Sequence, residues 1–243
     1  MKLKISRLKS KTSELNVDEF EVKETNLLKA LEEIKKNKDS SLSYRCGCKS
    51  GVCGSCTVRV NGVEKLACKT TINDSDLIEP LKNSKVIKDL VVDVSHETLL
   101  IKKTQAAMKV GLNKEVNQKD ILKIDIQSNC ILCQACYSSC PVYDVNKEFI
   151  GPYALTKAYR YEVDNRNDNP NIISNVQTNG IWDCTLCSAC TFVCPQGIDP
   201  KMDIMQLQNI SAQKGYSNPY LNSFDNNMGF DSNDFGFNPN GGF

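Results

Sequence analysis

The cysteines are the most informative residues of this chain, because most of them lie in runs with short and regular spacing. Residues 130–141 read CILCQACYSSCP and residues 184–195 read CTLCSACTFVCP, so one pattern occurs twice. Three cysteines at three-residue spacing, then a fourth and a proline, are typical ligands of a [4Fe–4S] cluster. In proteins with two such runs the fourth cysteine of each run binds the other cluster. We therefore predict two [4Fe–4S] clusters with crossed ligands, one on Cys130, Cys133, Cys136 and Cys194, the other on Cys184, Cys187, Cys190 and Cys140.

A third group of cysteines lies near the N-terminus. From Cys48 the spacing is C-x4-C-x2-C, the plant-type pattern of a [2Fe–2S] cluster. Gly51 and Gly54 suit such a loop, since cluster sulfides need close approach of backbone N–H groups. Cys46 is left over, and its gap to the next cysteine of the pattern is too long for a ligand, so we interpret it as a spare thiol. The predicted ligands are Cys48, Cys53, Cys56 and, further along the chain, Cys68.

The overall composition argues against several other classes of protein. With 30 basic and 29 acidic residues, the chain is not expected to bind nucleic acid or a membrane surface through charge. It has neither an apolar run long enough to span a membrane nor a secretory signal, so we predict a soluble chain. Thirteen cysteines are an odd number, which does not suit a disulfide framework, and there is a single histidine. Zinc also binds four thiolates, but zinc ribbons use two separated cysteine pairs rather than four-cysteine runs.

The remaining sequence predicts the elements that hold these cysteines. Alternation of apolar and polar residues predicts strands at 3–8 and 19–23, and a helical apolar face follows at 27–34 with Thr25 as its cap. Asn61-Gly62 predicts a hairpin that returns Cys68 to the cysteine loop. This order of elements is the opening of a plant-type ferredoxin. Further helices are predicted at 99–110, 152–161 and 202–212, and a surface loop at 164–175.

The predicted fold class is therefore α+β, in two domains and a tail. Residues 1–100 form a plant-type [2Fe–2S] ferredoxin domain of the β-grasp type, and residues 101–215 form a mostly helical, bacterial-type domain for two [4Fe–4S] clusters. Residues 216–243 are rich in Asn and Gly and contain neither Lys nor Arg, so they are not expected to fold alone. This tail is either disordered or a docking strap for a partner subunit, anchored by Phe224, Phe230, Phe235, Phe237 and Phe243.

Several segments resemble the iron–sulfur subunit of succinate dehydrogenases and fumarate reductases, in that family's order along the chain. They are DSSLSYR (39–45), CKSGVCGSC (48–56), LAC (66–68), IEPL (78–81), VIKDLVVD (86–93) and FIGPYALTKAYR (149–160). The resemblance implies a subunit that relays single electrons between a FAD-carrying flavoprotein and a quinone-facing or thiol-facing subunit. No nucleophile–base pair or nucleotide-binding motif occurs in the sequence. No catalytic residue is therefore expected on this chain, and the dicarboxylate chemistry is expected in the flavoprotein.

Two departures from the family pattern bear on the cofactors and partners. Many family members lack the second cysteine of the second run and hold a [3Fe–4S] cluster there, whereas the presence of Cys187 favours [4Fe–4S]. The familiar quinone-pocket tryptophan and histidine are replaced by residues 142–145 (VYDV) and Thr185. These departures resemble the variety whose third subunit is cysteine-rich, and whether that partner is membrane-associated stays open. Trp182 is expected to line a pocket or to keep a cluster dry, and His96 to be solvent-exposed or a local hydrogen bonder.

Two other functions stay open at this point. The chain could serve another flavin oxidoreductase, of the glycolate, glycerol-phosphate or heterodisulfide type, although the plant-type domain disfavours this. It could also be a free-standing ferredoxin or redox sensor. The expected location is the cytoplasm, or the inner-membrane periphery through partner subunits, and export with a signal-bearing partner stays open.

Overall fold

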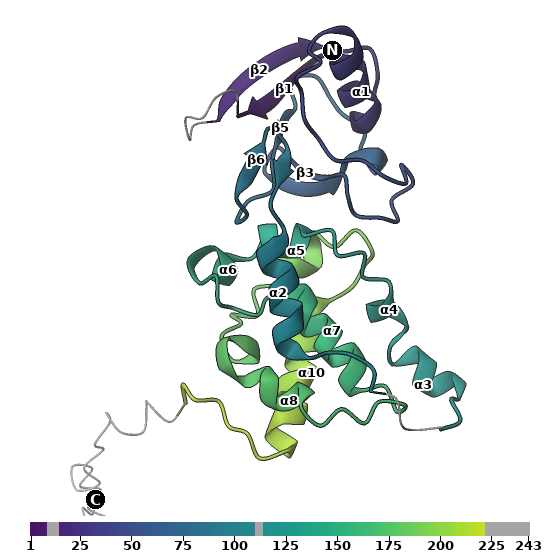
Figure 1. Ribbon diagram of the computed structural model, residues 1–243, viewed down its shortest axis with the longest axis vertical. Helices are drawn as coiled ribbons and strands as arrows, with labels where there is room; N and C mark the ends of the chain where they lie inside the picture. The colour runs from purple at the N-terminus through teal and green to yellow at the C-terminus, as the bar shows by residue number, and fades with distance from the viewer. Residues whose placement is uncertain (9–14, 110–113, 222–243) are drawn as a thin grey trace, which may run out of the picture.

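The computed structural model describes residues 1–8, 15–109 and 114–221. A sheet-containing N-terminal part and a helical C-terminal part lie one above the other along the longest axis (Figure 1). The α+β fold class predicted from the sequence is confirmed by this arrangement. The five phenylalanines predicted as anchors of the tail lie outside the described residues.

The N-terminal part is built on a five-stranded mixed sheet in the order β2-β1-β5-β3-β4. β1 and β2, which overlap the strands predicted at 3–8 and 19–23, pair antiparallel, while β1 and β5 run parallel. Leu3 and Ile5 are fully buried because alternate residues of a strand point to the same face. β3 and β4 form the predicted hairpin, with Val60 opposite Val63 and positive φ angles at both Asn61 and Gly62. The strands are β1 (Lys2–Arg7), β2 (Asn16–Glu21), β3 (Thr57–Val60), β4 (Val63–Leu66), β5 (Leu77–Glu79), β6 (Val86–Lys88) and β7 (Val91–Val92).

Helix α1 (Leu27–Asn37) buries the apolar face predicted for it against this sheet. Its cap is Asn26 rather than Thr25. The Asn26 side-chain oxygen accepts the Lys29 N–H at 3.2 Å, which satisfies an N–H group that the first helical turn leaves free. Thr25 lies one position too early and instead accepts the Ile72 N–H through its backbone carbonyl.

A buried ion-pair network fixes the start of the first cysteine loop. The Arg7 guanidinium is 2% exposed and lies 3.0 Å from Asp89 and 2.7 Å from Asp39. The second oxygen of Asp89 accepts the Ser43 N–H at 2.8 Å. Because a buried cation needs paired carboxylates, Arg7 holds together β1, the β6–β7 turn and the chain that leads into the cysteines.

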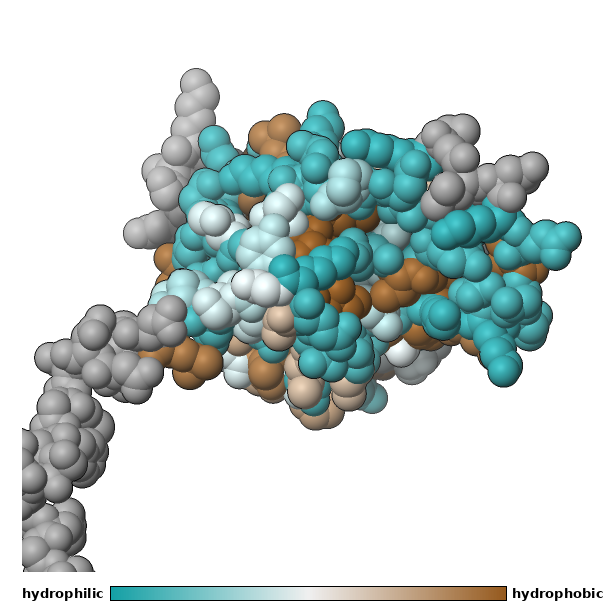
Figure 2. Space-filling view, turned by 90° about the horizontal axis from the view of Figure 1, so that it is seen from below, coloured by the Kyte–Doolittle hydropathy of each residue, from teal (hydrophilic) through white to brown (hydrophobic). Residues whose placement is uncertain are grey.

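The C-terminal part is organised around α7 and α10, which pack against each other. α2 spans residue 100, the predicted domain boundary, and packs on α7 and α8. The helices are α2 (Ser95–Thr104), α3 (Gln118–Leu122), α4 (Asp125–Ser128), α5 (Ala135–Ser138), α6 (Pro141–Val145), α7 (Pro152–Glu162), α8 (Ile172–Asn175), α9 (Ala189–Phe192) and α10 (Pro200–Gln213), with the short turn η2 (Gln177–Ile181). A second short turn, η1 (Ala67–Lys69), belongs to the N-terminal part and follows β4. Viewed from below, the face of this part farthest from the sheet is mostly hydrophilic with hydrophobic patches (Figure 2).

Two predictions for the helical part are wrong in detail. The helix predicted at 99–110 begins at Ser95 and ends at Thr104, because Gln105 adopts a left-handed backbone conformation. The segment 164–175 is not simply a surface loop, since it contains α8 and buries Ile172 and Ile173 in the helical core. Its Asn and Asp residues suggested exposure, but Asp164 is buried in an ion pair with Arg166.

Candidate iron–sulfur centres

One cavity in the helical part is lined by four cysteines from two distant segments. Cys130, Cys133 and Cys136 come from the loop before α5 and from α5 itself, and Cys194 comes from the second run. These four are the thiols predicted for the first [4Fe–4S] cluster. Four cysteine sulfurs around one cavity are the donor set that such a cluster requires, so these residues fit the group.

A second cavity is lined by the other four predicted thiols. Cys184, Cys187 and Cys190 come from the second run, and Cys140 comes from the first. Thr185 and Val142 line the same cavity. Since Cys136 lies in α5 and Cys140 directly precedes α6, a short stretch of the first run contributes to both cavities.

The two runs fold into the same backbone loop. Leu132 and Leu186 have φ angles of 53° and 55°, and Gln134 and Ser188 have φ angles of 70° and 69°. A left-handed conformation costs a non-glycine residue roughly 1–2 kcal/mol, so four such residues at matching positions indicate a shared requirement. That requirement is to direct amides at sulfur, as in the Leu186 N–H bond to the Cys184 thiol at 3.4 Å. Sequence reasoning missed this feature, because these residue types carry no signal for positive φ.

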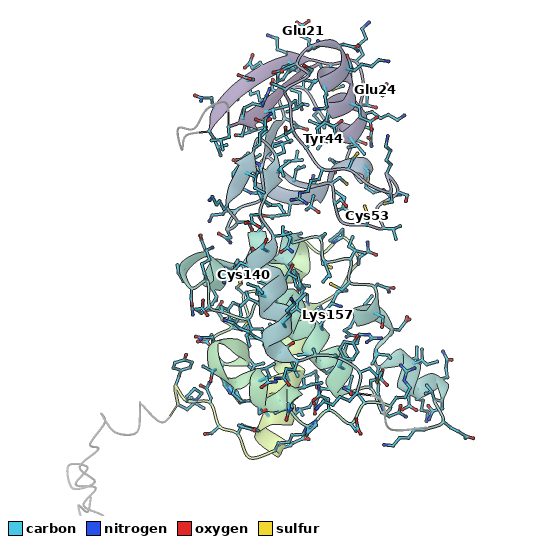
Figure 3. All side chains as sticks on the ribbon, in the orientation of Figure 1. Glu21, Glu24, Tyr44, Cys53, Cys140 and Lys157 are labelled. Carbon is cyan, nitrogen blue, oxygen red and sulfur yellow. The ribbon has the colours of Figure 1, made fainter. Side chains whose placement is uncertain are left out.

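The predicted [2Fe–2S] loop lies at the edge of the N-terminal part that faces the helices, where Cys53 is labelled in Figure 3. Cys48 and Cys53 are exposed, Cys68 is partly buried and Cys56 is buried. The Ser50 and Val52 amides donate to the Cys48 sulfur at 3.4 and 3.3 Å. Hydrogen bonds from the Ser50 side chain and from both amides lower the pKa of Cys48 to about 5, which favours the thiolate that binds iron.

Burial acts in the opposite direction on the thiols of the helical part. It raises the pKa of Cys133 to about 11 and that of Cys190 to about 12, and it raises the pKa of Cys136 well above the ordinary thiol value. Because metal ligation requires thiolates, iron would have to displace these protons when a cluster binds.

Across the described ranges, no three Cys, His, Asp or Glu side chains converge in a group that could hold a single metal ion.

Comparison with known proteins agrees with this geometry. Residues 2–98 match the family model for a 2Fe-2S iron-sulfur cluster binding domain, and residues 126–198 match that for a 4Fe-4S dicluster domain. The fumarate reductase iron-sulfur subunit of Haemophilus influenzae is 39% identical over 212 residues, which cover 78% of this chain and 83% of that protein. The Escherichia coli O6:H1 subunit of the same name is 38% identical over 196 residues, covering 75% of this chain and 79% of that protein. This chain belongs to the family of fumarate reductase and succinate dehydrogenase iron–sulfur subunits.

A further relative and one solved structure are also similar to this chain. The 8-methylmenaquinol:fumarate reductase iron-sulfur subunit of Wolinella succinogenes is 34% identical over 214 residues, covering 80% of this chain and 66% of that protein. A chain of the Mycobacterium smegmatis Sdh1 complex in its apo form has the same fold, with a TM-score of 0.78 at 24% identity over 89% of this chain and 97% of that chain. As an iron–sulfur subunit, the chain contains a 2Fe-2S domain followed by a 4Fe-4S dicluster domain.

The two domains of this iron–sulfur subunit are locked together beside the cysteines. A Cβ atom added to Gly54 would lie 2.7 Å from the Ile131 carbonyl oxygen and 2.9 Å from Cys133 Cα, so the [2Fe–2S] loop touches the first run. Gln196 donates to the Gly51 carbonyl at 3.2 Å, and Ser138 donates to Glu64 at 2.7 Å. We expected glycine here to admit a cluster, but Gly54 also admits the neighbouring domain. The sequence carries no signal for these contacts.

The structure shows the surroundings of three further residues that the sequence analysis singled out. Trp182 packs on the helical core and donates its indole N–H to Gln177 at 2.8 Å, which favours packing over a pocket wall. His96 is partly exposed, and its Nδ1 lies 2.9 Å from the Tyr143 hydroxyl, so it is a hydrogen bonder but not a local one. Cys46 is exposed, and its interpretation as a spare thiol stays a prediction.

In the segments that the structure describes, no helix has the length and apolarity to cross a bilayer.

A buried carboxyl group beside the first cavity was not predicted. Asp203 of α10 is 3% exposed and accepts hydrogen bonds from Gln127 and Thr156, both at 2.8 Å. Burial raises its pKa to about 6, against the hydrogen bonds that lower it. Thr156 also lines the first cavity, so Asp203 connects α10, α7 and α4 next to the predicted cluster.

Asp203 should make stability depend on pH. Its pKa of about 6 in the folded protein lies above the ordinary aspartate pKa of 3.8, so the folded protein binds more protons than the unfolded chain between these two pH values. Its contribution to stability is therefore full below pH 3.8 and is lost as pH rises through 6. Between pH 5 and pH 8, we expect the free energy of unfolding of wild type to fall by about 1.4 kcal/mol relative to that of Asp203→Asn. Anaerobic thermal unfolding of both proteins across this range measures the difference, and parallel pH profiles would contradict it.

Proposed function

We propose that this chain relays single electrons through one [2Fe–2S] and two [4Fe–4S] clusters in a fumarate reductase or succinate dehydrogenase complex. The donor or acceptor at the N-terminal domain would be a flavoprotein that carries FAD, and the helical domain would face a third subunit. The clusters would hold and pass electrons, while this chain's thiols, amides and domain contacts would fix their spacing. The observation that carries the proposal is the continuous order of the three cysteine sites along the molecule.

The order of the sites supports a relay. Cys53 and Cys56 flank Gly54, which touches Cys133 of the first run. Cys136 lines the first cavity, and Cys140, four residues further along the chain, lines the second. A relay needs adjacent centres and little reorganisation, and a single rigid path through α5 and the interdomain contact would supply both. We infer the crossed ligand sets from this arrangement.

Exposed apolar residues beside two of the cysteine sites support the proposed partners. Val52 in the [2Fe–2S] loop is 67% exposed beside two exposed cysteines, a suitable surface for the flavoprotein. In the helical part, Val145 of α6 and Phe192 of α9 are 87% and 85% exposed. Exposed apolar groups beside the second cavity are suited to a docking subunit. With Thr185 and Val142 lining that cavity, we infer a cysteine-rich third subunit through which the complex attaches to the inner membrane.

The cluster content is testable without a partner. Protein purified anaerobically should carry about ten iron atoms per chain, two from one centre and four from each of the others. Oxidised [2Fe–2S] and [4Fe–4S] centres are diamagnetic, so the oxidised protein should give no EPR signal. A stoichiometric signal from the oxidised protein would identify a [3Fe–4S] centre and overturn the role assigned to Cys187. A colourless protein that binds zinc instead would refute the relay itself.

The relay is tested by mixing this chain with a FAD-carrying fumarate reductase or succinate dehydrogenase flavoprotein from the same organism. Succinate should reduce the flavin, and the EPR signal of the reduced [2Fe–2S] cluster should then appear in this chain. The Cys48→Ala variant supplies the control, because it removes a predicted ligand of the receiving cluster. A stable complex in which succinate reduces the flavin but no cluster would contradict the proposal. Failure to form any complex would favour a free-standing ferredoxin.

A further inference from the structure

One side chain of the N-terminal domain is hydrogen-bonded to the short linker that joins the two cysteine cavities of the helical part. Cys136 lines the first cavity and Cys140 lines the second, so residues 136–140 form this cysteine linker. Asn83 lies in the turn between β5 and β6 and is partly buried. Its side-chain amide donates to three backbone carbonyl oxygens of the linker, those of Tyr137 at 2.9 Å, Ser138 at 3.1 Å and Cys140 at 3.3 Å.

The cysteine linker has little of its own to fix its shape. Helix α5 is a single turn, Ala135–Ser138, and a helix this short is not stable by itself in water. The last turn of a helix also leaves backbone carbonyls without partners inside the helix. The Asn83 amide supplies donors at this helix end, and one of its two hydrogens is shared because three oxygens accept from it. α5 and α6 lie at the end of the helical part nearest the sheet, which brings the linker to the domain of Asn83 (Figure 1).

Both the side chain and the backbone conformation of Asn83 are specific. Its φ angle is 70°, in the left-handed region that asparagine adopts more readily than most residues other than glycine. Glycine would suit this backbone but has no amide. The side-chain carbonyl oxygen of Asn83 is buried and has no hydrogen-bond partner among the described residues, which costs free energy. The donor end of the amide therefore makes the contacts, and these contacts are with the linker carbonyls.

Neighbouring contacts hold the linker from the same side. The Lys82 N–H donates to Ser138 Oγ at 2.8 Å, and the Ser138 hydroxyl in turn donates to Glu64 at 2.7 Å. The Lys82 ammonium also pairs with Asp144 at 2.6 Å, but this pair is exposed and such pairs contribute little to stability. The hydrogen bonds of Asn83 and Ser138 therefore fix the linker against the N-terminal domain.

We propose that Asn83 is a positioning residue that fixes the separation of the two [4Fe–4S] clusters by holding the cysteine linker. Its hydrogen bonds go to the backbone, so it acts through Cys136 and Cys140 and not on iron. Electron transfer between two centres slows as they move apart, and this linker is the short covalent connection between the two ligand sets. The inference rests on the proposed function, because it requires Cys136 and Cys140 to bind different clusters.

The separation of the clusters is measured by the magnetic interaction between them. Each reduced [4Fe–4S] cluster carries an unpaired spin, and the coupling of two such spins weakens steeply with distance. In EPR spectra of the fully reduced chain, purified anaerobically, wild type should show a splitting from this coupling. Asn83→Asp keeps the size and the left-handed tendency of the residue, but replaces the donor by an oxygen that repels the linker carbonyls. Its splitting should be smaller than that of wild type. Asn83→Gly removes the amide with neither added charge nor backbone strain, and it should reduce the splitting as well.

Asn167→Asp is the matched control for loss of a side-chain amide. Asn167 is also partly buried, and its amide donates to the Tyr161 carbonyl oxygen at 2.8 Å, in the last turn of α7 and outside the cysteine linker. This variant loses the same kind of hydrogen bond within the helical part, so its splitting should equal that of wild type. All three variants should retain about ten irons, because none of these side chains is a predicted cluster ligand.

The outcomes distinguish this inference from the proposed function. An unchanged splitting in an Asn83 variant that retains its iron, or an equal decrease in Asn167→Asp, would overturn the role of Asn83 and leave the relay intact. Loss of about four irons from both Asn83 variants would mean that Asn83 is needed to retain a cluster, which also refutes the positioning role. A wild-type chain without two interacting four-iron clusters would contradict the proposed function itself.

Discussion

The Cys194→Ala variant is expected to lose the cluster of the first cysteine run, although Cys194 belongs to the second run. Its side chain lines the same cavity as Cys130, Cys133 and Cys136. Burial raises the pKa values of the thiols around that cavity, which favours their protonated form. Without the fourth ligand the cluster is lost, and the three remaining cysteines then become protonated. This is the largest effect we predict, because an entire redox centre disappears.

Iron analysis of single and double variants distinguishes crossed from uncrossed ligation. With crossed ligands, Cys130→Ala, Cys194→Ala and the corresponding double variant should each retain about six of ten irons, since all remove one [4Fe–4S] cluster. Combining Cys194→Ala with Cys187→Ala should leave about two irons, since both four-iron clusters are lost. Cys46→Ala is the matched control and should retain all ten. Iron loss that is additive for Cys130 and Cys194, but not for Cys187 and Cys194, would show that each run binds its own cluster.

The Gly54→Ala variant is expected to be destabilised and to slow electron transfer between the domains. Gly54 has a φ of +69°, and an added Cβ would lie 2.7 Å from the Ile131 carbonyl and 2.9 Å from Cys133. The left-handed backbone and the overpacking together cost roughly 2–5 kcal/mol. Because the contacted atoms are backbone, relief requires the domains to separate, which lengthens the distance between the [2Fe–2S] loop and the first run.

Gly62→Ala separates the two causes. Gly62 has a φ of +82°, but its nearest atom is a guanidinium nitrogen of Arg59 at 3.6 Å. This control should therefore lose only the roughly 1–2 kcal/mol of backbone strain and keep wild-type electron transfer. Anaerobic thermal unfolding gives the stability of each protein, and freeze-quench EPR after flavoprotein reduction gives the rate at which the first [4Fe–4S] cluster is reduced. Equal transfer rates in Gly54→Ala and wild type would mean that this contact does not set the spacing of the centres.

Local sequence signals were sufficient for the elements that present the cysteines. Alternation predicted two strands that overlap β1 and β2, apolar spacing predicted the buried face of α1, and Asn61-Gly62 predicted the β3–β4 turn. Each of these signals reports the conformation of neighbouring residues. The errors also have local causes. Thr25 and Asn26 are both good caps, and only the hydrogen bond to Lys29 decides between them.

The sequence by itself determined which thiols exist, their spacing and the cluster types that this spacing favours, because ligand type and short-range geometry are properties of a few adjacent residues. The paired runs also predicted that Cys194 joins the first run's cavity. Only the tertiary structure decided that Gly54 rests on Cys133 and that Asp203 is buried beside that cavity. These contacts join residues far apart in the chain, and they arise when the helices of one domain pack together or when the two folded domains pack against each other. No periodicity or motif records such packing, since it depends on the shapes of both surfaces together.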